Sequence, residues 1–260
     1  MHILVTNDDG VQAPGLLALA QAMRQVADKV TVLAPDRNWS ASGHVKTLER
    51  PLRVVETALD DGSSAWASDG APSDCVALAQ MGFIPEKIDL VVSGINPNAN
   101  IGHDVTYSGT VTAAMEAAIW GIPGVAVSLD RPEGLTGEVD YRDAAEAARR
   151  VVAWLATQPS LPKDLILNVN VPYGSLDEMK GFRLTRQGLR IYHDELVRRL
   201  DPRGRPYFWI GGEAPTGVEE PGTDYGALSA GYISITPIQL DLTSRKVMDW
   251  MSTEAFETSV

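Results

Sequence analysis

The sequence has little that would build a secreted, thiol-rich or membrane-spanning protein. Its 260 residues include one cysteine, Cys75, which excludes a disulfide within the chain and a zinc site made of several thiols. No apolar run approaches the roughly 20 residues that span a bilayer. The amino terminus has no basic segment and no apolar run long enough for a signal peptide. We therefore expect a cytoplasmic protein with no membrane partner.

Positive charge is also scarce. The chain has 22 Lys and Arg against 34 Asp and Glu, which gives a formal net charge of -12. Such a surface repels nucleic-acid backbones, so we expect no nucleic-acid polymer as a partner. A site for a small anion must then supply positive charge locally, and a metal ion is one way to do so. Hydrophobic residues make up 44% of the chain, which is enough for one large core.

Strand-like and helix-like patterns alternate through the first two thirds of the chain. Continuous apolar runs typical of buried strands lie at 3–5, 30–34, 88–92, 125–129 and 165–171. Apolar residues at helical spacing lie at 16–26, 111–119 and 144–155. This alternation predicts an α/β fold with a doubly wound, mostly parallel, Rossmann-like sheet. Right-handed crossovers would bring the carboxyl ends of the strands to one edge.

The pattern changes after residue 180. Between Gly181 and Gly212, arginines and aromatic residues mix with turn residues, and Asp201-Pro202-Arg203-Gly204 is typical of a tight turn. We predict a long hairpin here, a strand at Gly231–Thr236 and a last helix at Lys246–Phe256. The predicted organisation is thus an α/β core over residues 1–180, which carries the site, and an extension over 181–260 that partly returns to the sheet.

Polar clusters follow three of the predicted strands. The first is Asn7-Asp8-Asp9-Gly10. Two adjacent carboxylates at the end of a buried strand are costly unless a cation or hydrogen bonds neutralise them. They favour a site for a hard cation such as Mg²⁺ or Mn²⁺, and the alternative is an Asx turn that caps the next helix.

The second cluster covers residues 36–44. Ser40 offers a neutral oxygen to a metal ion, and His44 is a candidate substrate contact. The alternative here is an ordinary surface loop, because loops favour small polar residues.

The third cluster covers residues 93–110. Asn96 and Asn100 carry amides that can act as carbonyl ligands or as donors. Ser108-Gly109-Thr110 comes just before a helix-like segment, where free backbone amides and the helix dipole favour phosphate. The alternative is a simple N-cap.

Taken together, these motifs resemble those of the SurE (survival protein E) family of cytoplasmic 5′/3′-nucleotidases. The matching motifs, in family order, are Asn7-Asp8-Asp9-Gly10, Asp36-Arg37-Asn38 with Ser40, Ser93-Gly94-Ile95-Asn96, Tyr107-Ser108-Gly109-Thr110-Val111, Asp201-Pro202-Arg203-Gly204 and Gly231-Tyr232-Ile233-Ser234. The resemblance covers nearly the whole chain. Two residues depart from it: Asn98 stands where the family commonly has glycine, and Ala71 where threonine commonly precedes proline. We expect Asn98 to alter the loop beside Asn96.

The resemblance implies one divalent metal ion per subunit, Mg²⁺ or Mn²⁺. The implied metal ligands are Asp8, Asp9, Ser40 and Asn96, of which Asp8, Asp9 and Asn96 are also the catalytic residues. The implied phosphate contacts are Asn100, Ser108, Gly109 and Thr110. The resemblance also implies a homodimer or homotetramer formed through the Gly181–Gly212 hairpin and the C-terminal segment.

The activity implied is hydrolysis of nucleoside monophosphates to nucleoside and phosphate by metal-assisted water attack. The preference for 5′ or 3′ phosphate, action on short polyphosphate and the general base stay open. An aspartyl-phosphate hydrolase needs two carboxylates spaced two residues apart, whereas Asp8 and Asp9 are adjacent. A non-catalytic nucleotide-binding module is disfavoured because no Gly-x-Gly-x-x-Gly or Walker loop follows the first strand. A purely structural interpretation would make the polar clusters caps and turns.

Overall fold

The computed structural model of the chain describes residues 1–253, and a nine-stranded sheet forms its centre. In spatial order the strands are β3 (Val54–Ala58), β4 (Ser64–Ser68), β2 (Lys29–Pro35), β1 (His2–Thr6), β5 (Leu90–Asn96), β6 (Gly124–Asp130), β7 (Ile166–Pro172), β11 (Ile233–Ile238) and β8 (Phe182–Leu184). The pairs β3–β4 and β7–β11 are antiparallel, and the other neighbouring pairs are parallel. The predicted α/β fold with a mostly parallel sheet is confirmed.

Helices cover both faces of this sheet. Side chains of β1 alternate between the faces: Ile3 and Val5 belong to one apolar cluster and Leu4 to another, and all three are fully buried. The first cluster takes in α1 (Pro14–Met23) and α4 (Arg142–Ala156), which pack against each other. The second takes in α2 (Pro72–Leu78) and α3 (Gly109–Ile119), which also pack together. The sheet is therefore doubly wound, as predicted.

The strand order reverses direction between β1 and β5. From β1 the chain proceeds through β2 to β4 on one side, and from β5 through β6 to β7 on the other. The segments that leave the carboxyl ends of β1 and β5 therefore diverge and open a crevice between them, where ligands commonly bind in such sheets. The first and third polar clusters of the sequence both lie at this point.

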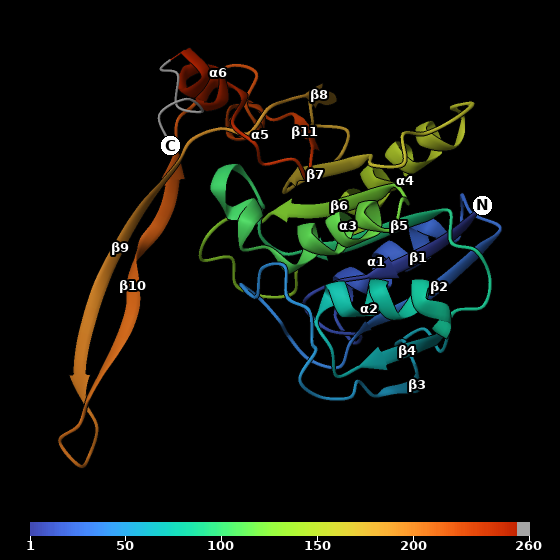
Figure 1. The fold of residues 1–260 in the computed structure, drawn as a ribbon, viewed down its shortest axis with the longest axis horizontal. Coiled ribbons are helices and arrows are strands. Elements are labelled where there is room, and N and C mark those ends of the chain that lie inside the picture. Colours follow the sequence, from blue (N-terminus) through green and yellow to red (C-terminus); the bar gives the residue numbers. More distant parts are fainter. Residues whose placement is uncertain (254–260) are drawn as a thin grey trace.

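A two-stranded antiparallel hairpin, β9 (Arg190–Leu200) with β10 (Pro206–Gly217), projects away from the sheet (Figure 1). Its turn is the predicted one. The Asp201 carboxylate accepts hydrogen bonds from the backbone of Arg203 and Arg205, each at 2.8 Å, and Gly204 has φ +75°. Since glycine adopts a positive φ more easily than any other residue, it suits this turn.

The hairpin was predicted at Gly181–Gly212, which begins and ends closer to the amino terminus than the observed hairpin does. The hairpin covers 190–217, because residues 182–184 instead pair with β11 as the edge strand β8 of the main sheet. Shorter elements are η2, a 3-10 helix (Gly102–Thr106), η1, a π-helical turn (Ala79–Phe83), and α5 (Asp224–Ser229). The last helix is α6 (Arg245–Thr253), and the remainder of the helix predicted up to Phe256 lies outside the described residues.

Within residues 1–253, no helix combines the length and the apolar character that crossing a bilayer requires.

Candidate active site

Asp8 lies at the end of β1 against the first turn of α3. Asp8 is 3% exposed, and its carboxylate accepts a hydrogen bond from the Thr110 hydroxyl. Burial raises the pKa of Asp8, and hydrogen bonds from the Thr110 side chain and from the backbone of Gly109 and Thr110 oppose that rise. A buried carboxylate is thus held at the positive end of a helix dipole, where negative charge is favoured.

Asp9 is partly buried beside it and has less compensation. Burial, followed by the negative charge of Asp8, raises the pKa of Asp9 to about 7. The nearest hydrogen-bonding contact of its carboxylate is a long one, 3.4 Å from the side-chain amide of Asn38. Two acidic groups with raised pKa values at one strand end form a site that a cation would stabilise.

Gly109 permits the close approach of α3 to Asp8. A Cβ atom on Gly109 would stand 2.7 Å from the Cβ of Asp8 and 3.1 Å from its Oδ2, closer than such atoms pack. Ser108 is the N-cap of α3, and its hydroxyl accepts a hydrogen bond from the Val111 amide at 3.1 Å. The predicted segment Ser108-Gly109-Thr110 therefore lies at a helix start next to the carboxylate pair. Its role in phosphate binding stays a prediction.

The loop after β5 carries the predicted asparagines. Asn96 donates from its amide nitrogen to the Asn98 carbonyl at 2.5 Å, which leaves the carbonyl oxygen of its side chain as the atom suited to a cation. Asn98 stands where the family commonly has glycine, but its φ is not positive: in the described part of the chain, Ala41 is the one non-glycine residue with a positive φ. Asn98 therefore causes no backbone strain of that kind.

Asn100 is held by a buried polar network that the sequence analysis missed. Its backbone amide donates to Asn170 Oδ1 at 2.8 Å and its side-chain amide to Ser128 Oγ at 2.8 Å. The side-chain amides of Asn168 and Asn170 donate to the backbone carbonyl oxygen of Asn100 at 2.7 and 3.1 Å. Two asparagines at alternating positions in the otherwise apolar strand β7 were the signal that could have revealed this network.

A cavity of about 820 Å³ opens above these residues. The predicted residues that line it are Asp8, Ser40, Asn96, Asn100 and Ser108. The unpredicted lining residues include Asp104, Tyr107, Asp130, Arg131, Glu133, Arg190, Pro215 and Tyr225. Arg190 forms an ion pair with Asp104 at 2.8 Å, so the root of the hairpin contributes to one wall. The structure thus brings residues as far apart in the chain as Asp8 and Tyr225 to one cavity.

His44, the candidate substrate contact, faces α3 instead of the cavity lining. Its Nε2 lies 2.9 Å from Oε2 of Glu116, a buried residue in the middle of α3. Contact between His44 and a substrate stays a prediction.

The candidate metal ligands form an all-oxygen set: two carboxylates, one hydroxyl and one amide carbonyl. In the described part of the chain, no three His, Cys, Asp or Glu side chains gather in a way that could hold a metal ion. A site with only two charged ligands and neutral oxygens suits a hard cation such as Mg²⁺ or Mn²⁺ better than zinc. The residues present therefore fit the metal ion that the sequence predicted.

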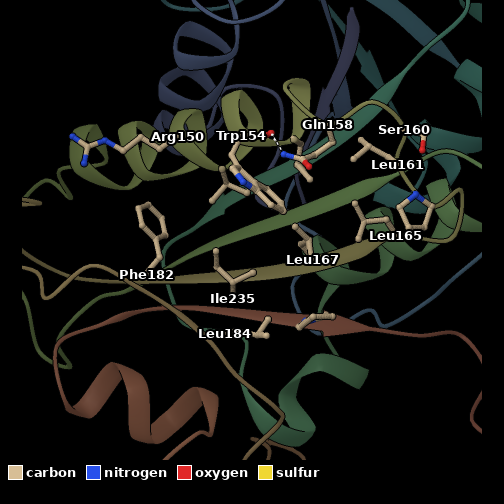
Figure 2. Close-up of a pocket in the computed structure, with 14 residues that line it drawn as sticks. Arg150, Trp154, Gln158, Ser160, Leu161, Leu165, Leu167, Phe182, Leu184 and Ile235 are labelled. Carbon is tan, nitrogen blue, oxygen red and sulfur yellow. Dashed lines mark hydrogen bonds between the residues drawn. The ribbon is translucent and has the colours of Figure 1, made fainter.

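A second cavity, of about 680 Å³, has a different character. It lies between α4 and the edge of the sheet formed by β7, β11 and β8, and Figure 2 shows Trp154, Leu167 and Ile235 on its walls. Its lining is almost entirely apolar and includes none of the predicted site residues. The polar chemistry therefore belongs to the first cavity.

Comparisons with known proteins identify the family of this chain. The family model "Survival protein SurE" matches residues 3–194. A protein of Herpetosiphon aurantiacus named 5′-nucleotidase SurE is 53% identical over 251 residues, with 96% of each chain covered. One of the same name from Chloroflexus aggregans is 52% identical over 249 residues, with 96% of this chain and 97% of the relative covered. The crystal structure of the SurE protein from Aquifex aeolicus superposes with a TM-score of 0.80 at 39% identity, with 98% of this chain and all of that chain covered. The chain belongs to the survival protein SurE family.

Proposed function

We propose that this protein is a divalent-metal-dependent 5′-nucleotidase, which hydrolyses nucleoside monophosphates to nucleoside and phosphate. The observation that carries the proposal is the pair Asp8 and Asp9 after β1: both have raised pKa values, and Asp8 lies against the first turn of α3. The name 5′-nucleotidase SurE, borne by relatives that are about half identical over nearly the full length, supports the choice of substrate.

The ligands proposed for one Mg²⁺ or Mn²⁺ ion are Asp8, Asp9, Ser40 and Asn96. When bound, the cation would act as a Lewis acid: its positive charge would neutralise phosphoryl oxygens and help to orient the attacking water. The site needs this positive charge because a phosphate dianion is repelled by the carboxylates of Asp8 and Asp9. The protein's net charge of -12 adds to the repulsion.

Protein groups also contact the phosphate in this proposal. We assign the phosphoryl contacts to Ser108, Gly109, Thr110 and the side chain of Asn100. In support, Ser108 and Asn100 line the cavity, and residues 108–110 form the start of α3, where a helix favours anions. Preorganised donors of this kind are each worth about 2–4 kcal/mol in a transition state. In the proposed reaction the water oxygen bonds to phosphorus, the bond between phosphorus and the nucleoside oxygen breaks, and that oxygen takes up a proton. Trapping a phospho-aspartate at Asp8 or Asp9 would contradict this direct attack.

The cavity has room for more than a phosphate group. Its lining also includes Tyr107, Arg131 and Tyr225, which offer polar and aromatic surface for a nucleoside. A nucleoside 3′-phosphate and short polyphosphate offer the same terminal phosphate to the site and are proposed as further substrates. We also propose that the protein forms a homodimer or homotetramer through the hairpin and the C-terminal segment.

A panel of phosphate esters tests the activity and its metal dependence. Phosphate release from nucleoside 5′- and 3′-monophosphates and tripolyphosphate is measured with EDTA, and then with Mn²⁺ or Mg²⁺ added back. We expect EDTA to abolish release, the metal to restore it, and Asp9→Asn to lose about 100-fold or more in kcat/KM, an effect of about 2.7 kcal/mol. Asp60→Asn, an exposed aspartate far from the site in sequence, is the matched control. Undiminished release in EDTA, or full activity in Asp9→Asn, would refute the proposal.

A further inference from the structure

The segment 40–47, which carries Ser40, is fastened to α3 through a buried carboxylate. Glu116 is 3% exposed and accepts hydrogen bonds from His44 at 2.9 Å, from Lys46 at 3.1 Å and from the Trp120 indole at 2.9 Å. Burial raises the pKa of Glu116, but these three hydrogen bonds outweigh it and lower that pKa to about 2. Glu116 is therefore a charged anchor for the segment and is not among the residues that line the cavity.

Further hydrogen bonds fix the same segment along its length. The Gly43 amide donates to the Tyr107 carbonyl at 2.9 Å, and the Thr112 hydroxyl donates to the Gly43 carbonyl at 3.1 Å. At the near end, the amide of Trp39 donates to the Asp8 carbonyl at 2.7 Å. Ser40 thus lies between a tie to Asp8 on one side and ties to α3 on the other.

The backbone beside Ser40 is strained. Ala41 has φ +56°, in the left-handed region that residues other than glycine, asparagine and aspartate rarely adopt. Ser40 and Ala41 are exposed, so packing does not hold this conformation. Strained backbone of this kind persists only where surrounding contacts enforce it, and the bonds to Glu116 are the charged ones among them.

We propose that Glu116 is a positioning residue: by binding His44 and Lys46 it holds the segment 40–47 in the strained conformation that keeps Ser40 beside Asp8, and so it sets the protein's affinity for the divalent cation. The inference rests on the proposed function, because it takes Ser40 as a metal ligand. Glu116 itself touches neither metal nor substrate. His44 is then a link between the segment and α3, in contrast to its predicted role as a substrate contact.

Metal binding tests this inference without relying on turnover. The dissociation constant of Mn²⁺ is measured by titration calorimetry on the metal-free full-length protein. We expect Glu116→Gln, which keeps the shape but loses the charge, to weaken Mn²⁺ binding about tenfold, as loss of a group that orients a metal ligand commonly does. Glu146→Gln removes the partner of Arg149 and Arg150 on the surface of α4 and should leave the dissociation constant unchanged.

A double-mutant cycle shows whether Glu116 acts through Ser40. If it does, the double variant S40A/E116Q binds Mn²⁺ as weakly as S40A alone, because the group being positioned is gone. A full, additive loss in the double variant would overturn the inference, as would an E116Q protein that binds Mn²⁺ like the wild type. A wild-type protein that binds no Mn²⁺ would overturn the proposed function itself, and the two failures are therefore distinguishable.

Substitutions at His44 provide a second route if E116Q does not fold, since His44 lies at the surface end of the contact. We expect His44→Ala to weaken Mn²⁺ binding and His44→Gln, whose amide can still donate to Glu116, to retain the wild-type affinity. If His44→Ala raised KM for the nucleotide at saturating Mn²⁺ but left the Mn²⁺ dissociation constant unchanged, His44 would be a substrate contact and the inference would be wrong.

Discussion

At the scale of single residues, Asp8 and Asp9 are neighbours in the chain but meet different surroundings. Asp8 is buried against α3 and receives hydrogen bonds from its first turn, whereas Asp9 has one long contact with Asn38. Because Asp9 lacks compensation, burial and the charge of Asp8 raise its pKa to about 7.

The raised pKa of Asp9 predicts a pH dependence of stability in the metal-free protein. An unfolded aspartate has a pKa near 3.8, so between about pH 4 and 7 the folded protein binds a proton that the unfolded chain releases. The contribution of this group is thus complete below the unfolded pKa and is lost as pH rises through about 7. Urea-denaturation midpoints measured in EDTA should fall over this window, and Asp9→Asn should remove that part of the fall. A difference between the two proteins that does not vary with pH would contradict the assignment.

Gly109 predicts a steric effect on the site. A methyl group at this position must displace the Asp8 side chain, whose Cβ would be 2.7 Å away. Since a misplacement of about 1 Å in a catalytic group can cost about 100-fold, we expect Gly109→Ala to lower kcat/KM by about that factor. Gly211→Ala in the hairpin, where the nearest atom is 3.6 Å from the new methyl, is the control. Equal activity in the two variants would show that Asp8 can move without loss.

At the scale of elements, the start of α2 lacks half of its cap. Asp74 accepts a hydrogen bond from the Ala71 amide at 2.9 Å, which is one half of a capping box, but the methyl group of Ala71 at the N-cap cannot accept the reciprocal bond. The departure from the family's threonine therefore concerns helix stability and leaves the site residues untouched.

Restoring that cap should stabilise the protein. Ala71→Thr adds a hydroxyl that can accept from the backbone amide of Asp74, and we expect it to raise the free energy of unfolding by about 1 kcal/mol relative to Ala71→Val. Valine has the same shape without the oxygen, so the difference between the two variants isolates the hydrogen bond from the effect of filling a buried position. Denaturant unfolding measures it. Identical midpoints for the two variants would mean that the hydroxyl does not cap α2.

At the scale of the whole molecule, the hairpin is the feature that the sheet does not account for. Large apolar side chains on it are open to solvent: Trp209 is 63% exposed, Leu196 71% and Ile210 83%. Exposed apolar surface of this extent marks an interaction site, and it supports the proposed contact between subunits. Arg190 and Pro215 at the hairpin root also line the active-site cavity. The proposed assembly and the active-site cavity therefore involve the same structural element.

A charge placed on this surface should disrupt the proposed oligomer. We expect Ile210→Asp to shift the protein from a dimer or tetramer toward the monomer, because burying an unpaired carboxylate in an apolar interface is costly. Light scattering coupled to size-exclusion chromatography measures the mass, and Glu213→Gln, on the same strand, is the control. A wild-type protein that is itself monomeric would contradict the proposed assembly, as would an Ile210→Asp variant of unchanged mass.

The sequence determined the parts of this protein that local patterns encode. Ile3, Leu4 and Val5 predicted a strand buried on both faces, and the turn at Asp201–Gly204 predicted the hairpin, because burial and turn formation depend on residues close in the chain. The order of the polar motifs also predicted the family. The edge strand β8 was missed because three residues carry no recognisable period, and only pairing with β11 makes them a strand.

The tertiary structure alone decided which side chains meet across long separations. It brought Asn168 and Asn170 under Asn100, and it placed His44 against Glu116, 72 positions along the chain. It also raised the pKa of Asp9 above the ordinary aspartate value, through burial and a neighbouring charge. Such contacts are products of how helices and strands pack, and a single sequence records the residues that take part but not the distances between them.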